Sequence, residues 1–208
     1  MNDRLYAPFA YNEAFDALEK VEKLMADAKK LLDKLSGNTR FAFYELIWLP
    51  LTADLNVQKM WLLTTLNHGF ADIGSTYAMT LGKEINECID YDRKIVDELH
   101  KIEGGKWYGM GLSEHIGFNA WCEEGCKYPV IHNFEPANKE RLIVTVKGVN
   151  AFSEGKFWTG HVLVSDAFLD PSKDEAELFL STAGIVKANF TVENPNSFIS
   201  VSEYVGLE

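Results

Sequence analysis

The sequence predicts an α+β fold in two segregated parts, an antiparallel helical bundle followed by a small antiparallel β-sandwich-like domain. Apolar residues recur every three or four positions through the first half of the chain, which is the period of amphipathic helices. In the last third they alternate with polar residues, which is the period of half-buried strands. Because the period changes near Pro136, we expect a bundle at 1–103, a connecting loop rich in glycine and aromatic residues at 104–139, and a β domain at 140–208.

The composition is that of a globular protein and argues against two kinds of partner. The 208 residues are 47% hydrophobic, which is enough to bury a core. A formal net charge of -11 and the lack of a basic stripe argue against nucleic acid and anionic membranes, since both attract clustered Lys and Arg. The start, MNDRLYAPFAY, lacks a basic stretch before a long apolar run, so we expect no signal peptide. No apolar run reaches membrane-spanning length, so we expect no transmembrane helix.

The first predicted helix covers residues 12–35. Asn12 is placed to cap its start, and Ser36-Gly37 to end it. Its polar face mixes lysines with acids and more helix follows, so we favour packing in a bundle over a helix lying on a membrane. The apolar face is formed by Ala14, Leu18, Val21, Met25, Ala28, Leu32 and Leu35.

Two further helices are predicted, at residues 39–81 and 83–103. The first is denser in apolar groups and is expected at the centre of the bundle, with a kink or break at Pro50, which has no amide hydrogen. Gly69 and Gly74 weaken that helix locally and favour a close backbone crossing. Gly104 and Gly105 are expected to stop the last helix. The charged residues in its middle are interpreted as part of its solvated face. These charged residues are Asp90, Asp92, Arg93 and Lys94.

Five short strands are predicted in the β domain, separated by turn residues such as those at 170–172. The β part is shorter than the roughly 100 residues of a usual sandwich, so we expect it to be truncated. The predicted strands are 142–146, 158–164, 177–181, 187–193 and 198–202.

Residues 104–121, GGKWYGMGLSEHIGFNAW, carry the candidate binding groups. Five glycines, two tryptophans and one histidine make a mixture too irregular for a helix and too rich in ring surface for a solvated linker. Loops of this kind present aromatic and cationic side chains for binding. The alternative is a structural plug between the helical and β parts, and composition leaves both interpretations open.

Three cysteines give no disulfide framework, but two of them form a candidate zinc set with two histidines. The set is His115, Cys122, Cys126 and His132. Its cysteine spacing is wider than the usual zinc pair and its histidines fit no familiar ligand pattern. A disulfide, a free thiol or plain packing is therefore favoured, and we expect no metal or other cofactor.

The common catalytic motifs are missing from the sequence. It has no glycine-rich phosphate loop after a strand, no G-x-S-x-G and no H-E-x-x-H. A nucleophile pair of Cys122 with His115 or His132 is left open, because spatial adjacency is unreadable from sequence. We therefore expect no catalysis by this chain alone.

Two stretches of the chain are similar to one known family. Residues 41–56, FAFYELIWLPLTADLN, match its helical pattern of an aromatic pair, a glutamate or glutamine, apolar residues, a proline and an asparagine. Residues 104–121 match its GGKW segment, followed by HIG, an aromatic residue and a tryptophan. The family that the chain resembles is glycoside hydrolase family 115, the xylan α-1,2-glucuronidases. The resemblance extends to 12–35 as the preceding bundle helix and, more loosely, to 187–206 as the opening of the C-terminal β-sandwich.

The resemblance implies a noncatalytic C-terminal region of an α-glucuronidase-like hydrolase of glucuronoxylan. In the family the catalytic carboxylate belongs to an upstream barrel domain, which this sequence does not match. The implied partners are that barrel of the parent chain, a second copy in a homodimer, and an oligosaccharide at the substrate approach; the parent enzyme is expected to be secreted or periplasmic. The loop residues implied for substrate binding are Lys106, Trp107, His115, Phe118 and Trp121.

Two positions depart from the family pattern. Phe118 stands where the family has tyrosine, and residues 122–126, CEEGC, replace a run that usually carries glutamine and proline. The alternatives are a stand-alone carbohydrate- or protein-binding module and a small enzyme built on the cysteine and histidine cluster.

If the chain is a piece of a larger enzyme, we expect it to expose an apolar patch beyond a few hundred Å². Its last two residues, Leu207-Glu208, resemble vector sequence before a purification tag.

Overall fold

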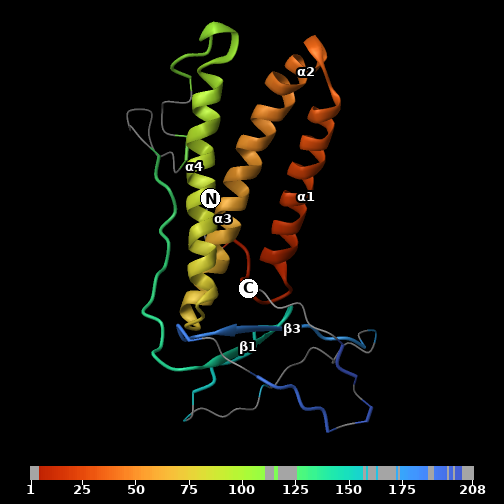
Figure 1. The fold of residues 1–208 in the computed structure, drawn as a ribbon, viewed down its shortest axis with the longest axis vertical. Coiled ribbons are helices and arrows are strands. Elements are labelled where there is room, and N and C mark those ends of the chain that lie inside the picture. Colours follow the sequence, from red (N-terminus) through yellow and green to blue (C-terminus); the bar gives the residue numbers. More distant parts are fainter. Residues whose placement is uncertain are drawn as a thin grey trace.

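The computed structural model is an α+β fold in which three long helices stand on a three-stranded antiparallel sheet (Figure 1). Neighbouring long helices run in opposite directions, as predicted for an antiparallel bundle. The start of α1, the end of α3 and the start of α4 lie at the sheet. The structure describes residues 5–110, 115–116, 126–156, 158, 163, 172, 174–186, 190–195, 197–198 and 200–202.

The first predicted helix is confirmed as α1 (Glu13–Lys34). Asn12 precedes it, but its amide donates to the Asp16 carboxylate, and no side-chain bond caps the helix. The break predicted as one possibility at Pro50 is absent, because the chain stays helical across it, and a π-helical turn lies just before the proline. Helix α2 (Gly37–Phe43) leads into η1 (Tyr44–Trp48), and α3 (Leu49–Asp72) follows with Pro50 in its first turn, where no amide hydrogen is needed.

The predicted division between the second and third helices, near residue 82, is wrong. The chain breaks earlier, at Gly74, and α4 (Tyr77–Leu99) begins there. Gly74 has a φ of 73°, the left-handed conformation that commonly ends a helix. A 3-10 turn, η2 (Ile102–Gly104), follows α4, and Gly104 and Gly105, both with positive φ, end the helical part as predicted.

The sheet has the order β2-β1-β3, with β1 (Leu142–Val146) at its centre. β1 pairs antiparallel with β2 (Phe152–Ser153) and β3 (Leu178–Thr182), and Val144 lies opposite Leu180. The predicted strands at 142–146 and 177–181 are thereby confirmed. β2 was not among the predicted strands, and it is only two residues long.

The other strand predictions fare differently. The described part of 187–193 contains no strand, and Phe190 and Val192 are 37% and 52% exposed. An alternating pattern forms a strand only where a neighbouring strand pairs with its backbone groups. The described residues of 198–202 are not in a strand either, and most of 158–164 lies outside the described residues. Within the described residues there is thus one antiparallel sheet, and the second sheet that a sandwich requires is not seen among them.

The helices and the sheet are segregated along the chain but share one core. Phe70 near the end of α3 is 1% exposed and contacts four other rings. The turn before α4 is also tied to β3, because the Thr76 amide donates to the Thr182 carbonyl over 2.7 Å. Each favourable ring pair contributes about 0.5–1.5 kcal/mol beyond the area that it buries. The four rings around Phe70 are Phe9, Phe15, Tyr77 and Phe179.

Gly69 allows the close crossing that the sequence predicted. The segment before α1 passes over α3 there, and a Cβ at Gly69 would lie 2.6 Å from the Cβ of Pro8.

Among the described helices, none combines the length and the apolar character that crossing a membrane requires.

We expect Gly69→Ala to destabilise the protein by about 1–3 kcal/mol, because the added methyl group overlaps Pro8. In an uncrowded helix the same change stabilises by about 1 kcal/mol, so the sign of the effect tests the contact. Urea unfolding is the measurement, with exposed Lys83→Ala in α4 as the control. A Gly69→Ala protein as stable as the wild type would contradict the crossing.

Candidate functional site

The described residues bring a carboxylate, an imidazole and a thiol together beside α4. Asp92 comes from the helix itself, His115 from the loop that follows it, and Cys126 from the start of an extended segment. That segment runs down the outside of α4 toward the sheet (Figure 1). One donor atom from each of the three residues lies within 4.8 Å of the others.

Asp92 is buried, which corrects its interpretation as part of the solvated face of the helix. It is 4% exposed, between the buried positions Ile89 and Ile95 on the inner face of α4. The signal that could have placed it inside is its register, because it falls three residues after Ile89 and three before Ile95. A charged residue on an apolar stripe needs a partner, and the sequence alone did not show one.

Three side chains surround the Asp92 carboxylate. Both carboxylate oxygens lie 3.1 Å from His115 Nε2, and the Tyr128 hydroxyl donates to Oδ2 over 2.8 Å. Burial alone would raise the pKa of Asp92, but the hydrogen bonds from His115 and Tyr128 and the charge of Arg93 outweigh it and lower the pKa below its usual value. Burial and the same carboxylate raise the pKa of the Tyr128 hydroxyl, so it stays a donor.

The Cys126 sulfur lies against the His115 ring without being aligned with either nitrogen. Sγ is 3.4 Å from Nδ1 and 3.7 Å from Nε2. A sulfur on the lone-pair axis of one nitrogen would be much further from the other, so the near-equal distances place it beside the ring. This differs from the aligned thiol and imidazole of a cysteine nucleophile.

The predicted zinc set is only partly assembled. His115 and Cys126 lie together, whereas His132 stacks on His68 with ring centroids 3.5 Å apart and does not belong to the donor group. Cys122 lies outside the described residues. The third donor is Asp92, which the sequence analysis had not considered as a ligand.

The residues implied for sugar binding are divided between two places. Trp107 and Lys106 lie beyond the end of α4, where the Trp107 indole donates to Glu45 Oε1 over 2.9 Å. The Lys106 ammonium lies 4.6 Å from the Trp107 ring centroid and pairs with Glu103 over 2.7 Å. His115 instead contacts Asp92, about two helical turns before the end of α4. Phe118 and Trp121 lie outside the described residues.

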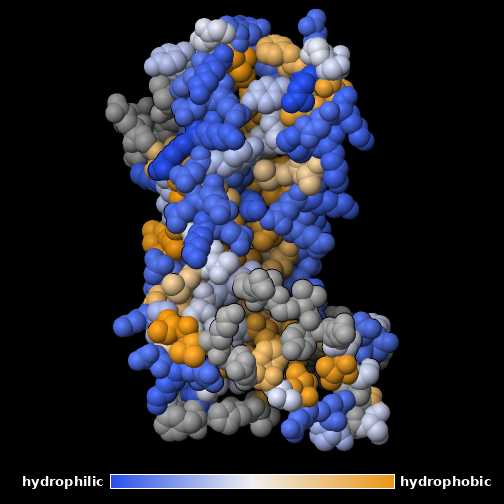
Figure 2. All heavy atoms as spheres, viewed as in Figure 1, coloured by the Kyte–Doolittle hydropathy of each residue, from blue (hydrophilic) through white to orange (hydrophobic). Residues whose placement is uncertain are grey.

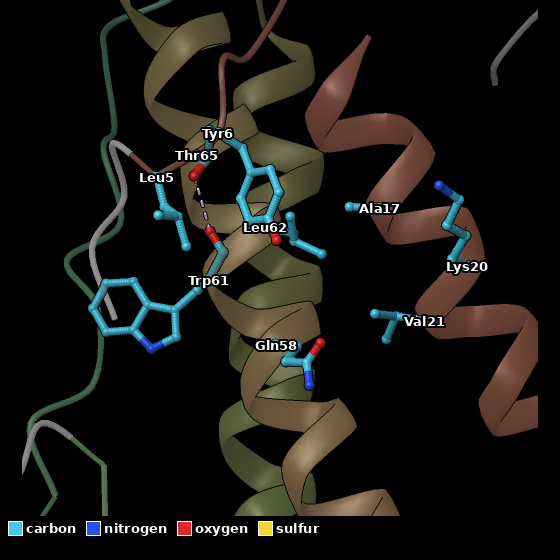
Figure 3. A pocket seen from close by; sticks show the side chains of 9 residues that line it. All are labelled: Leu5, Tyr6, Ala17, Lys20, Val21, Gln58, Trp61, Leu62 and Thr65. Atoms are coloured by element: carbon cyan, nitrogen blue, oxygen red, sulfur yellow. Dashed lines mark hydrogen bonds between the residues drawn. The ribbon is translucent and has the colours of Figure 1, made fainter.

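A pocket of about 200 Å³ lies between α1, α3 and the segment before α1 (Figure 3). Trp61 of α3 and Tyr6 of the leading segment flank it, and Lys20 and Gln58 lie at its edge. The sequence analysis singled out none of these four residues. The remaining lining is apolar apart from Thr65, and it consists of Leu5, Ala17, Val21, Leu62 and Thr65.

Comparison of the chain with protein-family models and with curated proteins gave no match.

We expect Tyr128→Phe to destabilise the protein by about 1–3 kcal/mol, because it removes a donor from a buried carboxylate. Chemical unfolding measures the loss. Tyr108→Phe is the control, since Tyr108 is 76% exposed. Equal effects of the two substitutions would show that the Tyr128 hydroxyl does not stabilise Asp92.

Acid should weaken the fold partly through Asp92. Its pKa is lower in the folded than in the unfolded protein, so its contribution is complete above the ordinary carboxyl pKa of about 3.9 and is lost as the pH falls through the lower folded value. Unfolding free energies measured from about pH 6 to pH 2.5 should therefore fall less steeply for Asp92→Asn than for the wild type. Asp90→Asn, at an exposed position, should retain most of the wild-type slope. Identical acid profiles for Asp92→Asn and the wild type would contradict this assignment.

Proposed function

We propose that this chain is a noncatalytic region of a hydrolase of the glycoside hydrolase family 115 type, active in its complete form on glucuronoxylan. Its role is to pack against the catalytic barrel and to support the loop after α4 at the substrate approach. The β part would then belong to a larger β-sandwich. The proposal starts from the resemblance of two sequence motifs, and one contact in the structure supports it most directly.

That contact joins the two motifs. Glu45 belongs to FYELIWLP and Trp107 to GGKW, 62 positions apart, and the indole of Trp107 donates to the Glu45 carboxylate. Tyr44 and Trp107 also pack against the same buried group, which includes Leu49 and Ile102. Two motifs that supply the two halves of one contact have a physical reason to occur together.

Two other residues of the motifs also hold the chain to the bundle. Asn56 closes the first motif, is 2% exposed and donates to the Cys88 carbonyl over 2.9 Å. His115 opens the HIG sequence and contacts buried Asp92. Because motif residues make intramolecular contacts, this arrangement favours a supporting role over catalysis by the chain itself.

Exposed apolar side chains support a role in packing against another domain or a second copy. At the end of the bundle farthest from the sheet, Leu46 is 70% exposed, Ile47 47% and Tyr108 76%. At the other end, Leu178 of β3 and Ile185 are 56% and 70% exposed. On the side shown in Figure 2 the helical body is mainly hydrophilic, and hydrophobic residues gather toward the sheet. Large exposed apolar groups at the ends of a molecule are typical of contact surfaces.

A stand-alone carbohydrate-binding module is the alternative, and the pocket beside α1 favours it. Aromatic rings flanking a small pocket with an amide and an ammonium at its edge provide stacking surface and hydrogen-bonding groups for a sugar. Trp61, Tyr6, Gln58 and Lys20 supply these groups. This alternative requires the chain to bind oligosaccharide without a partner.

Calorimetry and sedimentation distinguish the two functions. As a supporting region, the purified chain should give no heat with aldouronic acids or xylo-oligosaccharides, and it should form a complex with the barrel encoded upstream. Leu46→Asp with Ile47→Asp should abolish the complex, whereas Leu24→Asp with Leu31→Asp, 48% and 47% exposed on α1, should not. Heat that disappears in Trp61→Ala would instead establish the binding module.

We expect Trp107→Phe to cost about 1.5–3 kcal/mol of stability, because it removes the hydrogen bond to a charged acceptor. Glu45→Gln keeps an acceptor and should cost less. Guanidinium unfolding followed by circular dichroism measures both, with Tyr108→Phe as the control at a position that is 76% exposed. If Trp107→Phe and Tyr108→Phe unfold alike, the contact between the motifs does not support the fold.

A further inference from the structure

We propose that Asp92, His115 and Cys126 bind one divalent metal ion of the zinc class, with Tyr128 holding the carboxylate from behind. This site is independent of the supporting role proposed above. Carboxylate oxygen, imidazole nitrogen and thiolate sulfur are the three kinds of ligand that proteins use for Zn²⁺. The thiolate makes the set soft, so Zn²⁺ or Co²⁺ is preferred over Mg²⁺ and Ca²⁺.

The separations of the other two donor atoms from His115 Nε2 are close to those of a tetrahedral site, whereas the direction of the sulfur is not. Bonds of about 2.0–2.3 Å to Zn²⁺ place neighbouring ligand atoms about 3.3–3.8 Å apart. His115 Nε2 lies 3.1 Å from the Asp92 oxygens and 3.7 Å from Cys126 Sγ. The sulfur and the carboxylate lie within 4.8 Å of each other. Because the sulfur rests beside the His115 ring, the Cys126 side chain has to swing toward the in-plane position beyond Nε2 to complete the set.

The ligand on His115 is Nε2. This nitrogen faces the carboxylate at 3.1 Å and is the one that would exchange its proton for the metal. The His115 side chain is 34% exposed and Cys126 is half-buried, so solvent and metal reach the site, while Asp92 at its base is buried. Three protein ligands leave a fourth position for water or another small molecule.

The three ligands are held before a metal arrives. Asp92 is fixed by α4 and by the 2.8 Å hydrogen bond from Tyr128, the outer contact that orients a ligating carboxylate. The two loop ligands are tied to each other, because the Lys127 amide donates to the Ile116 carbonyl over 2.9 Å. Ile116 is 2% exposed in the main core, so His115 and Cys126 each neighbour an anchored residue.

The local charge favours a cation. The buried Asp92 carboxylate carries one negative charge, and a metal that binds Cys126 displaces the thiol proton, so the bound divalent ion is neutralised by a carboxylate and a thiolate. The nearby Arg93 guanidinium lies 5.5 Å from the Tyr128 ring centroid and pairs with Asp90 over 3.1 Å. The positive charge of Arg93 is thus partly neutralised by Asp90, which reduces its repulsion of a bound cation.

The test is titration of the metal-stripped full chain with Co²⁺ and Zn²⁺. We expect one equivalent of Co²⁺ to give a thiolate-to-cobalt charge-transfer band together with the intense visible bands of tetrahedral cobalt, and one equivalent of Zn²⁺ to displace it. Cys126→Ser should lose the charge-transfer band, and His115→Ala and Asp92→Asn should weaken binding. Tyr128→Phe should keep the band but weaken affinity about tenfold to a hundredfold, as expected of an outer partner.

Two substitutions serve as matched controls. Cys88→Ser changes a buried cysteine of α4 whose thiol pKa is raised by burial to about 11, and His132→Ala changes the histidine that stacks on His68. Both should bind cobalt as the wild type does. A band that survives Cys126→Ser or disappears in Cys88→Ser would overturn the ligand set, and so would the absence of any band.

A second measurement avoids dependence on the folding of the variants. In the wild-type chain, Zn²⁺ should slow alkylation of Cys126 by iodoacetamide, as followed by mass spectrometry of its peptide. Mg²⁺ at the same concentration should not. Unchanged alkylation of Cys126 at saturating Zn²⁺ would overturn the proposal.

Discussion

The buried carboxylate of Asp92 is the constraint that holds His115 and Tyr128 against α4. A carboxylate on the inner face of a helix costs several kcal/mol unless donors surround it. His115 and Tyr128 provide those donors, and both reach Asp92 from chain segments far from it in sequence. The positions of His115 and Tyr128 are therefore set by a polar requirement of the helix. Removing either donor leaves part of that requirement unmet.

Phe70 joins the helices to the sheet. Its ring contacts residues of the leading segment, α1, α4 and β3, so four parts of the chain meet at the end of α3. Hydrogen bonds from the turn at Ser75 and Thr76 to β3 strengthen the same junction. Such a shared core stabilises the small sheet, since a sheet of a few short strands needs a packed apolar face or a helix against it to be stable in water.

Much of the helical architecture could be predicted from the sequence, because its hydrophobic period is regular. The period placed α1 within one residue at each end. It could not show that Gly74, rather than residue 82, ends α3, since a glycine inside a helix and one that ends it look alike until its φ is known. Phe190 and Val192 alternate as in a strand, yet pairing depends on a neighbour that the sequence does not identify.

The candidate site could be predicted only in part. His115 and Cys126 were candidates because of their residue types, but Asp92 was assigned to the solvated face since most charged residues of a helix lie there. Its position on the apolar stripe was the available signal. The stacking of His132 on His68 joins α3 to a distant segment, and no sequence spacing indicates such a contact.

The most direct test of this account is a long-range ¹H–¹⁵N correlation spectrum of the histidine rings in the metal-free protein. An ionised Asp92 can only accept hydrogen bonds, so the account predicts that His115 carries its proton on Nε2 in the wild type. This preference should weaken in Asp92→Asn, whose amide can either accept or donate, and Zn²⁺ should replace the proton on Nε2. A His115 ring that exchanges freely between its tautomers, and is unaffected by Asp92→Asn, would contradict it.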